Sequence, residues 1–183
     1  KFLKSQGKLN GNTVVTTVMS NMGLYKAFEA EGINYEQTAV GDKYVAENML
    51  ENNYSIGGEQ SGHVIFSRYS ATGDGILTSL MIMEACVEQK ATLCDLAKEM
   101  KVYPQILRNV RVADKKTARE NPKVVEAVEA AARALSTDGR ILVRESGTEP
   151  LIRVMVEAET DELCHQYVDS VVEVMEAEGL IVG

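Results

Sequence analysis

Apolar residues in the N-terminal part of the chain follow continuous runs at some positions and helical spacing at others. The segment from Thr13 to Met19 is β-branched or apolar throughout, which is typical of a strand buried on both faces of a parallel or mixed sheet. Apolar residues then recur at helical spacing in several segments. They are Leu24, Tyr25 and Phe28; Val45, Met49 and Leu50; and Ile76, Leu77, Leu80, Met81 and Ala85.

Short extended segments separate these predicted helices. Ser55–Gly57 and His63–Phe66 are expected to be strands joined by a Gly-rich loop. Asn21 is placed to cap the first helix and Gly32 to end it, and Thr92 with Asp95 resembles a capping box. Because strands and helices alternate, this part of the chain predicts an α/β unit with a mixed sheet.

The pattern changes after Pro104. Gln105 to Val112 is strand-like, and Asn121-Pro122 predicts an N-cap followed by proline at the first helical position. The helix that follows carries an apolar stripe at Val124, Val128, Ala131 and Leu135. The sequence therefore predicts a domain boundary here, with residues 1–104 in one domain and residues 105–183 in the next.

The last part of the chain contains two more predicted strands and one helix. Ile141–Val143 and Leu151–Val156 flank a polar loop, and Thr160 is placed to cap the final helix. The inward face of that helix is expected at Leu163, Tyr167, Val171, Val174 and Met175. This order predicts a small α+β domain, in which two helices cover an antiparallel sheet.

Composition limits the class of protein. The 183 residues include 19 Lys and Arg against 27 Asp and Glu, a formal net charge of −8. This acidic balance argues against a nucleic-acid-binding module. It does not exclude a local basic pocket, because net charge says little about a single cleft. No apolar run approaches the roughly 18 residues of a membrane span, so no membrane partner is expected.

Cysteine and histidine are too sparse for a disulfide framework or a zinc site. Cys86, Cys94 and Cys164 are odd in number and form no Cys-x-x-Cys pair, which indicates reduced thiols and a cytoplasmic location. A metal site needs ligands clustered at short spacing, and the sequence has only two histidines, His63 and His165, so no metal site is predicted. The N-terminus lacks a long apolar segment, so it is interpreted as part of an excised piece and not as a secretory signal.

The first loop with candidate chemistry covers residues 57–63. Its three glycines permit sharp turns and close approach of a ligand. Glu59, Ser61 and His63 supply an acceptor, a hydroxyl and a titratable imidazole, a mixed set that suits the hydroxyls of a sugar ring. On composition alone, a glycine-rich hairpin with solvated polar side chains is an equally good interpretation.

The second loop covers residues 144–150, with Arg153 just beyond it. Arginine side chains bind phosphate oxygens bidentately, and exposed N–H groups around Gly147 would add neutral donors. Glu145 and Glu149 are expected to point outward or to hold the arginines in place. The alternative is an ordinary loop between strands with surface ion pairs.

Weaker candidates lie elsewhere. Asp74 is expected to cap a helix, with a role for residues 72–75 in shaping the sugar loop as the alternative. Lys43 at a helix start could reach a ligand or could simply be solvated. His165 is expected on the surface, and the acidic run Glu157–Glu162 is expected to be a solvated helix start.

Both loops together resemble a known family. Residues 58–63, Gly-Glu-Gln-Ser-Gly-His, resemble the sugar-binding loop of the α-D-phosphohexomutase superfamily, and residues 144–150, Arg-Glu-Ser-Gly-Thr-Glu-Pro, resemble its phosphate-binding loop. They occur in the same order as in the family. Residues 16–24 and 40–45 look like the bacterial phosphoglucosamine mutase branch, and the resemblance covers essentially the whole chain.

The resemblance implies the third and fourth of the family's four domains. The third would be a mixed α/β domain, and the fourth an antiparallel sheet with two helices, similar to the TATA-binding-protein architecture. The sugar would be held by Glu59, Ser61, Gly62 and His63, with Lys43 as a weaker candidate and His63 also suited to proton transfer. The phosphate would be held by Arg144, Ser146, Gly147, Thr148 and Arg153.

The family's phosphoserine loop (Ser-His-Asn-Pro type) and metal loop (Asp-Gly-Asp-x-Asp-Arg type) are absent from this sequence. The resemblance therefore implies a fragment, inactive alone, of an enzyme that interconverts glucosamine 6-phosphate and glucosamine 1-phosphate through a phosphoserine and a bisphosphate. Mg²⁺ would bind outside this chain, and the missing N-terminal domains would be its partner. The alternatives are a phosphomannomutase or phosphoglucomutase fragment, or a stand-alone phosphosugar-binding module.

Overall fold

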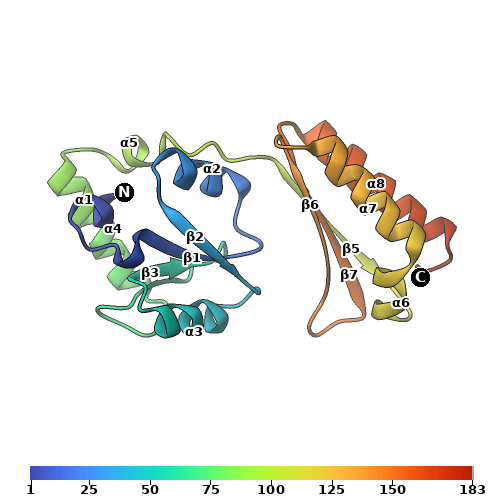
Figure 1. Ribbon diagram of the computed structural model, residues 1–183, viewed down its shortest axis with the longest axis horizontal. Helices are drawn as coiled ribbons and strands as arrows, with labels where there is room; N and C mark the ends of the chain where they lie inside the picture. Colours follow the sequence, from blue (N-terminus) through green and yellow to red (C-terminus); the bar gives the residue numbers. More distant parts are fainter. Residues whose placement is uncertain (183) are drawn as a thin grey trace. The chain divides into compact units, whose positions relative to one another are not determined.

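The computed structural model describes residues 1–182, which form two compact units, Lys1–Val102 and Tyr103 onward (Figure 1). Each unit contains its own sheet. Within the described residues, no helix is both long and apolar enough to span a membrane.

A four-stranded sheet with the order β2-β1-β3-β4 forms the centre of the first unit. Its strands are β1 (Thr13–Thr17), β2 (Asn34–Thr38), β3 (Ile56–Gly58) and β4 (Val64–Phe66). β1 is parallel to β2 and β3, whereas β4 is antiparallel to β3. The sheet is therefore mixed, which confirms the predicted fold class of this part.

The helices of the first unit follow the predicted order. They are α1 (Phe2–Ser5), the 3₁₀ turn η1 (Asn10–Asn12), α2 (Met22–Ala30), α3 (Asp42–Asn52), α4 (Gly75–Gln89) and α5 (Leu93–Ala97). Asn21 caps α2, Asp74 caps α4, and Thr92 with Asp95 forms the capping box of α5. The short α1 and η1 have no apolar periodicity and were not predicted.

Three apolar residues predicted on inward helix faces lie in solvent instead. Leu50 on α3 is 84% exposed, whereas Val45 and Met49 of the same helix are buried against the sheet. On α4, Ile76 is 78% and Leu80 is 57% exposed. On α4 the prediction was wrong because the helix is apolar around most of its circumference, so spacing alone does not select its inner face. On α3, Leu50 directly follows the buried Met49 and so lies about 100° around the helix from it.

The second unit is built on a three-stranded antiparallel sheet with the order β5-β7-β6. Its strands are β5 (Gln105–Arg111), β6 (Arg140–Glu145) and β7 (Leu151–Glu157). Its helices are α6 (Lys115–Glu120), α7 (Pro122–Leu135) and α8 (Asp161–Ala177). The α+β class is confirmed, and α6 is a short additional helix that the apolar pattern did not indicate.

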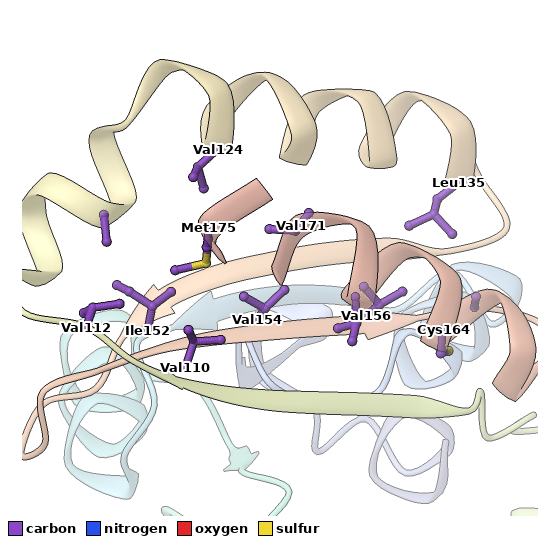
Figure 2. Packing of buried hydrophobic residues seen from close by; sticks show 13 residues of the cluster. Val110, Val112, Val124, Leu135, Ile152, Val154, Val156, Cys164, Val171 and Met175 are labelled. Atoms are coloured by element: carbon purple, nitrogen blue, oxygen red, sulfur yellow. The ribbon is translucent and has the colours of Figure 1, made fainter. Parts of the chain in front are cut away.

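Figure 2 shows how α7 and α8 cover one face of this sheet with a continuous apolar layer. Ile152 and Val154 from β7 and Met175 from α8 are fully buried in it. Leu163 is 36% exposed, and the neighbouring Cys164 takes the buried position. The expected inward face of α8 was therefore shifted by one residue at its start.

Glu157 is not the solvated residue that the acidic run predicted. It is the last residue of β7, and its side chain is 0% exposed. Arg140 Nε donates to Glu157 Oε2 at 2.7 Å, and Gln105 Nε2 donates to Oε1 at 2.5 Å. The charge is tolerated because these partners from both neighbouring strands neutralise and hydrogen-bond it.

Candidate functional site

The predicted sugar loop is a tight hairpin connection between β3 and β4. The Glu59 N–H donates to the His63 carbonyl at 3.0 Å, and the Gly62 N–H donates to the Glu59 carbonyl at 3.0 Å. Gly62 has φ +99°, which a side chain would strain. A Cβ on Gly58 would lie 2.9 Å from the His63 carbonyl oxygen, so this close crossing requires glycine.

Polar groups of this loop converge on the carboxylate of Glu59. Ser61 Oγ donates to Glu59 Oε1 at 2.6 Å, and His63 Nδ1 lies 2.9 Å from the same oxygen. The Glu59 side chain is only 8% exposed, whereas that of His63 is 56% exposed. The structure thus brings together three of the predicted sugar-site residues, with the imidazole as their most accessible member.

These contacts shift the titration of both ionisable groups. Burial alone would raise the pKa of Glu59, but hydrogen bonds from Ser61, His63 and the Gly41 N–H outweigh it and hold the pKa below its usual value. The hydrogen bond to Glu59 raises the pKa of His63, and the nearby charge of Asp42 adds to the effect. The loop therefore favours a protonated His63 beside an ionised Glu59.

A pH titration tests this coupling. The ion pair is fully present between about pH 4.5 and 6.5, above the ordinary Glu59 value and below that of His63. It is lost as pH rises through the elevated His63 pKa, and as pH falls through the depressed Glu59 pKa. NMR titration of the His63 ring should give a pKa above about 6.5 that falls in Glu59→Gln. The exposed control Glu51→Gln should leave it unchanged, and equal values in all three proteins would contradict the coupling.

Two neighbouring segments contact the loop through Gly41 and Gly73, and not through Lys43, the residue that the sequence suggested. Gly41 donates its N–H to Glu59, as described above. A Cβ on Gly73 would lie 3.1 Å from His63 Cβ, so the 72–75 segment packs against the loop while Asp74 caps α4. Lys43, by contrast, is 73% exposed and lies 3.8 Å from Glu47, one turn along α3. Its role as a sugar ligand stays a prediction.

A mostly apolar cavity of about 520 Å³ in the first unit is lined in part by residues 57–60 of this loop. Leu24, Phe28 and Met81 contribute to its walls, and Glu59 reaches its edge. Thr16, Ser20 and Asn21 also line it, but the lining is mostly apolar and suits an apolar group better than a sugar, which needs many hydrogen-bond partners. The polar face of residues 59–63 is therefore the better candidate for a sugar contact.

The predicted phosphate loop lies between β6 and β7, in the second unit. Arg144 on β6 and Arg153 on β7 are direct cross-strand partners. The Nε atoms of both are buried and lack a hydrogen-bond partner among residues 1–182. Burial and the charge of Arg153 lower the pKa of Arg144. Two like charges placed opposite each other with unpaired donors indicate a site for an anion.

The 144–150 loop has one buried residue, Ser146, that forms internal hydrogen bonds, and it exposes the residues that follow. Ser146 is 2% exposed, and its Oγ accepts a hydrogen bond from the Glu149 N–H at 3.3 Å. Gly147 and Thr148 are exposed, and a Cβ on Gly147 would meet nothing within 4 Å. Ser146 therefore shapes the loop and retains its own hydroxyl proton as a donor, while the next residues present the accessible groups.

Both acidic residues of the loop are engaged with arginines. Glu149 lies 3.4 Å from Arg153, and Glu145 lies 3.4 Å from Arg119 on α6. Lys115, also on α6, donates from Nζ to the Ser146 carbonyl at 2.8 Å. The sequence interpretation missed Lys115 and Arg119. The N-cap Asp114, whose side chain accepts from the Thr117 N–H, is the local signal that could have located this helix.

No group of three or more His, Cys, Asp or Glu side chains able to hold a metal ion exists among residues 1–182. His165 lies exposed on α8, where the sequence placed it. The two loops therefore stay candidate sites, residues 144–153 for an anion and the Glu59 cluster for hydroxyl groups.

Comparison with known families and proteins gives a consistent result. Residues 1–103 match the family described as phosphoglucomutase/phosphomannomutase, alpha/beta/alpha domain III, and residues 107–174 match its C-terminal domain. The phosphoglucosamine mutase of Lachnospira eligens is 60% identical over 181 residues, and that of Bacillus subtilis is 54% identical over 178. These matches cover 99% and 97% of this chain but 40% of each relative. The chain thus spans less than half the length of these relatives.

Solved structures share the fold at lower identity. An N-acetylglucosamine-phosphate mutase in its substrate complex matches 95% of this chain and 41% of its own, with a TM-score of 0.77 and 23% identity. The N-acetylphosphoglucosamine mutase of Aspergillus fumigatus, in complex with glucose 1,6-bisphosphate, matches 98% of this chain and 41% of its own, with a TM-score of 0.77 and 18% identity.

Proposed function

The chain belongs to the phosphoglucomutase/phosphomannomutase family, and we propose that it is the sugar- and phosphate-binding half of a phosphoglucosamine mutase. The observation that best supports this proposal is the cross-strand pair Arg144 and Arg153, whose buried Nε atoms lack a hydrogen-bond partner among residues 1–182. Such a pair is unfavourable in the free protein and becomes favourable when an anion neutralises it.

In this proposal the second unit holds the phosphate that is not being transferred. Arg144 and Arg153 supply charge and N–H donors, and Gly147 and Thr148 add exposed donors from the loop. Ser146 shapes the loop and donates its hydroxyl proton. Fixing one end of a substrate in this way accelerates a reaction at the other end, because the reacting group is already positioned.

The first unit holds ring hydroxyls. An ionised Glu59 accepts hydrogen bonds, and Ser61 both donates and accepts. The exposed His63 ring is available for a hydroxyl contact or for proton transfer, and its hydrogen bond to Glu59 raises its pKa. Gly62 gives the ligand access to the turn, and Lys43 remains a secondary contact.

The proposed reaction of the whole enzyme is the interconversion of glucosamine 6-phosphate and glucosamine 1-phosphate through a phosphoserine outside this chain. Mg²⁺ would offset charge at the transferring phosphoryl group. Among residues 1–182 no cluster of side chains forms a site for this ion. Apart from the proton transfer open to His63, the contacts assigned to this chain concern binding and orientation. The proposal includes a cytoplasmic location and catalysis only together with the preceding domains.

Binding measurements on this chain test the proposal. Inorganic phosphate should shift the amide NMR signals of residues 144–150, and glucosamine should shift those of residues 57–63. Glucosamine 6-phosphate should shift both sets of signals, and the chain alone should not convert it to glucosamine 1-phosphate. The phosphates of glucose and mannose form the control panel for the sugar.

The outcomes separate the alternatives. Tighter binding of glucose or mannose phosphates than of the glucosamine compound would retain the family but replace the substrate. Absence of any phosphate-induced shift in residues 144–150 would refute the phosphate assignment. Turnover by this chain alone would show that the catalytic assignment to other domains is wrong.

A further inference from the structure

We propose that Lys115 is a positioning residue of the phosphate loop, which holds the Ser146–Gly147 peptide so that the Gly147 N–H faces the bound phosphate. This inference rests on the proposed phosphate-binding function of the loop. Lys115 is the first residue of α6, and its Nζ lies 2.8 Å from the Ser146 carbonyl oxygen. Its side chain thus connects a separate helix to the backbone of the loop.

The geometry of the peptide bond transmits this contact to the other side of the loop. The carbonyl of Ser146 and the N–H of Gly147 belong to one planar unit, and in a trans peptide they point in opposite directions. Holding the carbonyl toward α6 therefore turns the N–H away from α6. Within residues 1–182 the Gly147 N–H has no hydrogen-bond acceptor, and the space beside its Cα is open.

Lys115 completes the fixation of Ser146. The Ser146 N–H donates to the Leu151 carbonyl at 2.9 Å, and Ser146 Oγ accepts from Glu149. The carbonyl is the remaining backbone polar group, and Lys115 Nζ donates to it. An ammonium at this oxygen also polarises the peptide, which makes the N–H a stronger donor to an anion.

The same helix neutralises the adjoining carboxylate. Arg119 lies one turn after Lys115, and its Nη1 is 3.4 Å from Glu145 Oε1. Residues four apart share a helix face, so both cations reach the start of the loop from α6. Lys116, between them, is exposed, and its charge acts on Asp114, the N-cap of α6, so it serves as a control of equal charge on the same helix.

The test compares Lys115→Met with Lys116→Met in this chain. Two quantities are measured, namely the Kd for inorganic phosphate and the backbone order parameter of Gly147 without ligand. For Lys115→Met we expect the Kd to rise about tenfold and the order parameter to fall from about 0.85 toward 0.6. Lys116→Met should stay within about twofold of wild type in Kd, as expected for an exposed charge. Lys115→Arg, which keeps charge and donors, should retain most of the affinity.

Several results would overturn the proposal. Equal losses in the two methionine variants would indicate a general charge effect, and so would a raised Kd with an unchanged Gly147 order parameter. If wild type does not bind phosphate, the proposed function fails, while the order parameter still decides whether Lys115 fixes the peptide. If Lys115→Met does not fold, Lys115→Gln is used in its place, and it should likewise raise the Kd and lower the Gly147 order parameter more than Lys116→Met does.

Discussion

Replacing Arg144 with alanine should weaken the binding of phosphosugars and inorganic phosphate by about 10- to 150-fold, or about 1.5–3 kcal/mol, the range for hydrogen bonds to a charged group. The guanidinium is half-buried beside Arg153, and its Nε has no partner among residues 1–182. An anion would supply the missing acceptor. Isothermal titration calorimetry with glucosamine 6-phosphate measures the loss directly.

The same substitution should leave the free protein as stable as wild type, or more stable by about 0.2–1 kcal/mol, because it removes a like-charge pair across two strands. Arg133→Ala is the matched control, since Arg133 carries the same charge on the exposed surface of α7. Its binding should change little. If Arg144→Ala binds as wild type does, or if it lost affinity only by unfolding, the arginine pair would not be a phosphate site.

Replacing Arg140 with methionine should destabilise the second unit by about 3 kcal/mol, because it leaves a buried carboxylate without its cationic partner. Glu157 is 0% exposed, and Arg140 Nε donates to it at 2.7 Å. Methionine keeps much of the stem volume, so the effect reports the lost charge. Native-state hydrogen exchange at core amides of β7, such as Val154, measures this unit separately from the first one.

Two comparisons make this result specific. In the double variant Arg140→Met/Glu157→Met the buried charge is absent, so at least half of the lost stability should return. Arg133→Met breaks the exposed pair with Glu129, at 3.5 Å, and should cost less than about 1 kcal/mol. Equal effects of Arg140→Met and Arg133→Met would mean that the Glu157 charge is not compensated by Arg140.

Local signals were sufficient for most elements and for both loops. Asn121-Pro122, Asp74 and the Thr92–Asp95 box begin helices as their sequence patterns predicted, because capping involves only neighbours along the chain. Apolar spacing failed where a helix is apolar on several sides, as for Leu80 on α4. It also missed α6, whose cationic residues Lys115 and Arg119 carry no apolar periodicity.

The sequence by itself determined the two fold classes, the two glycine-containing loops and the residue types that each loop offers. Only the tertiary structure decided which groups meet. Strand register placed Arg144 opposite Arg153, sheet packing buried Glu157 beside Arg140, and α6 brought Lys115 to the Ser146 carbonyl. These contacts depend on the pairing of segments distant in sequence. A local pattern specifies turns and periodicity, but it does not specify which distant partner a side chain will find.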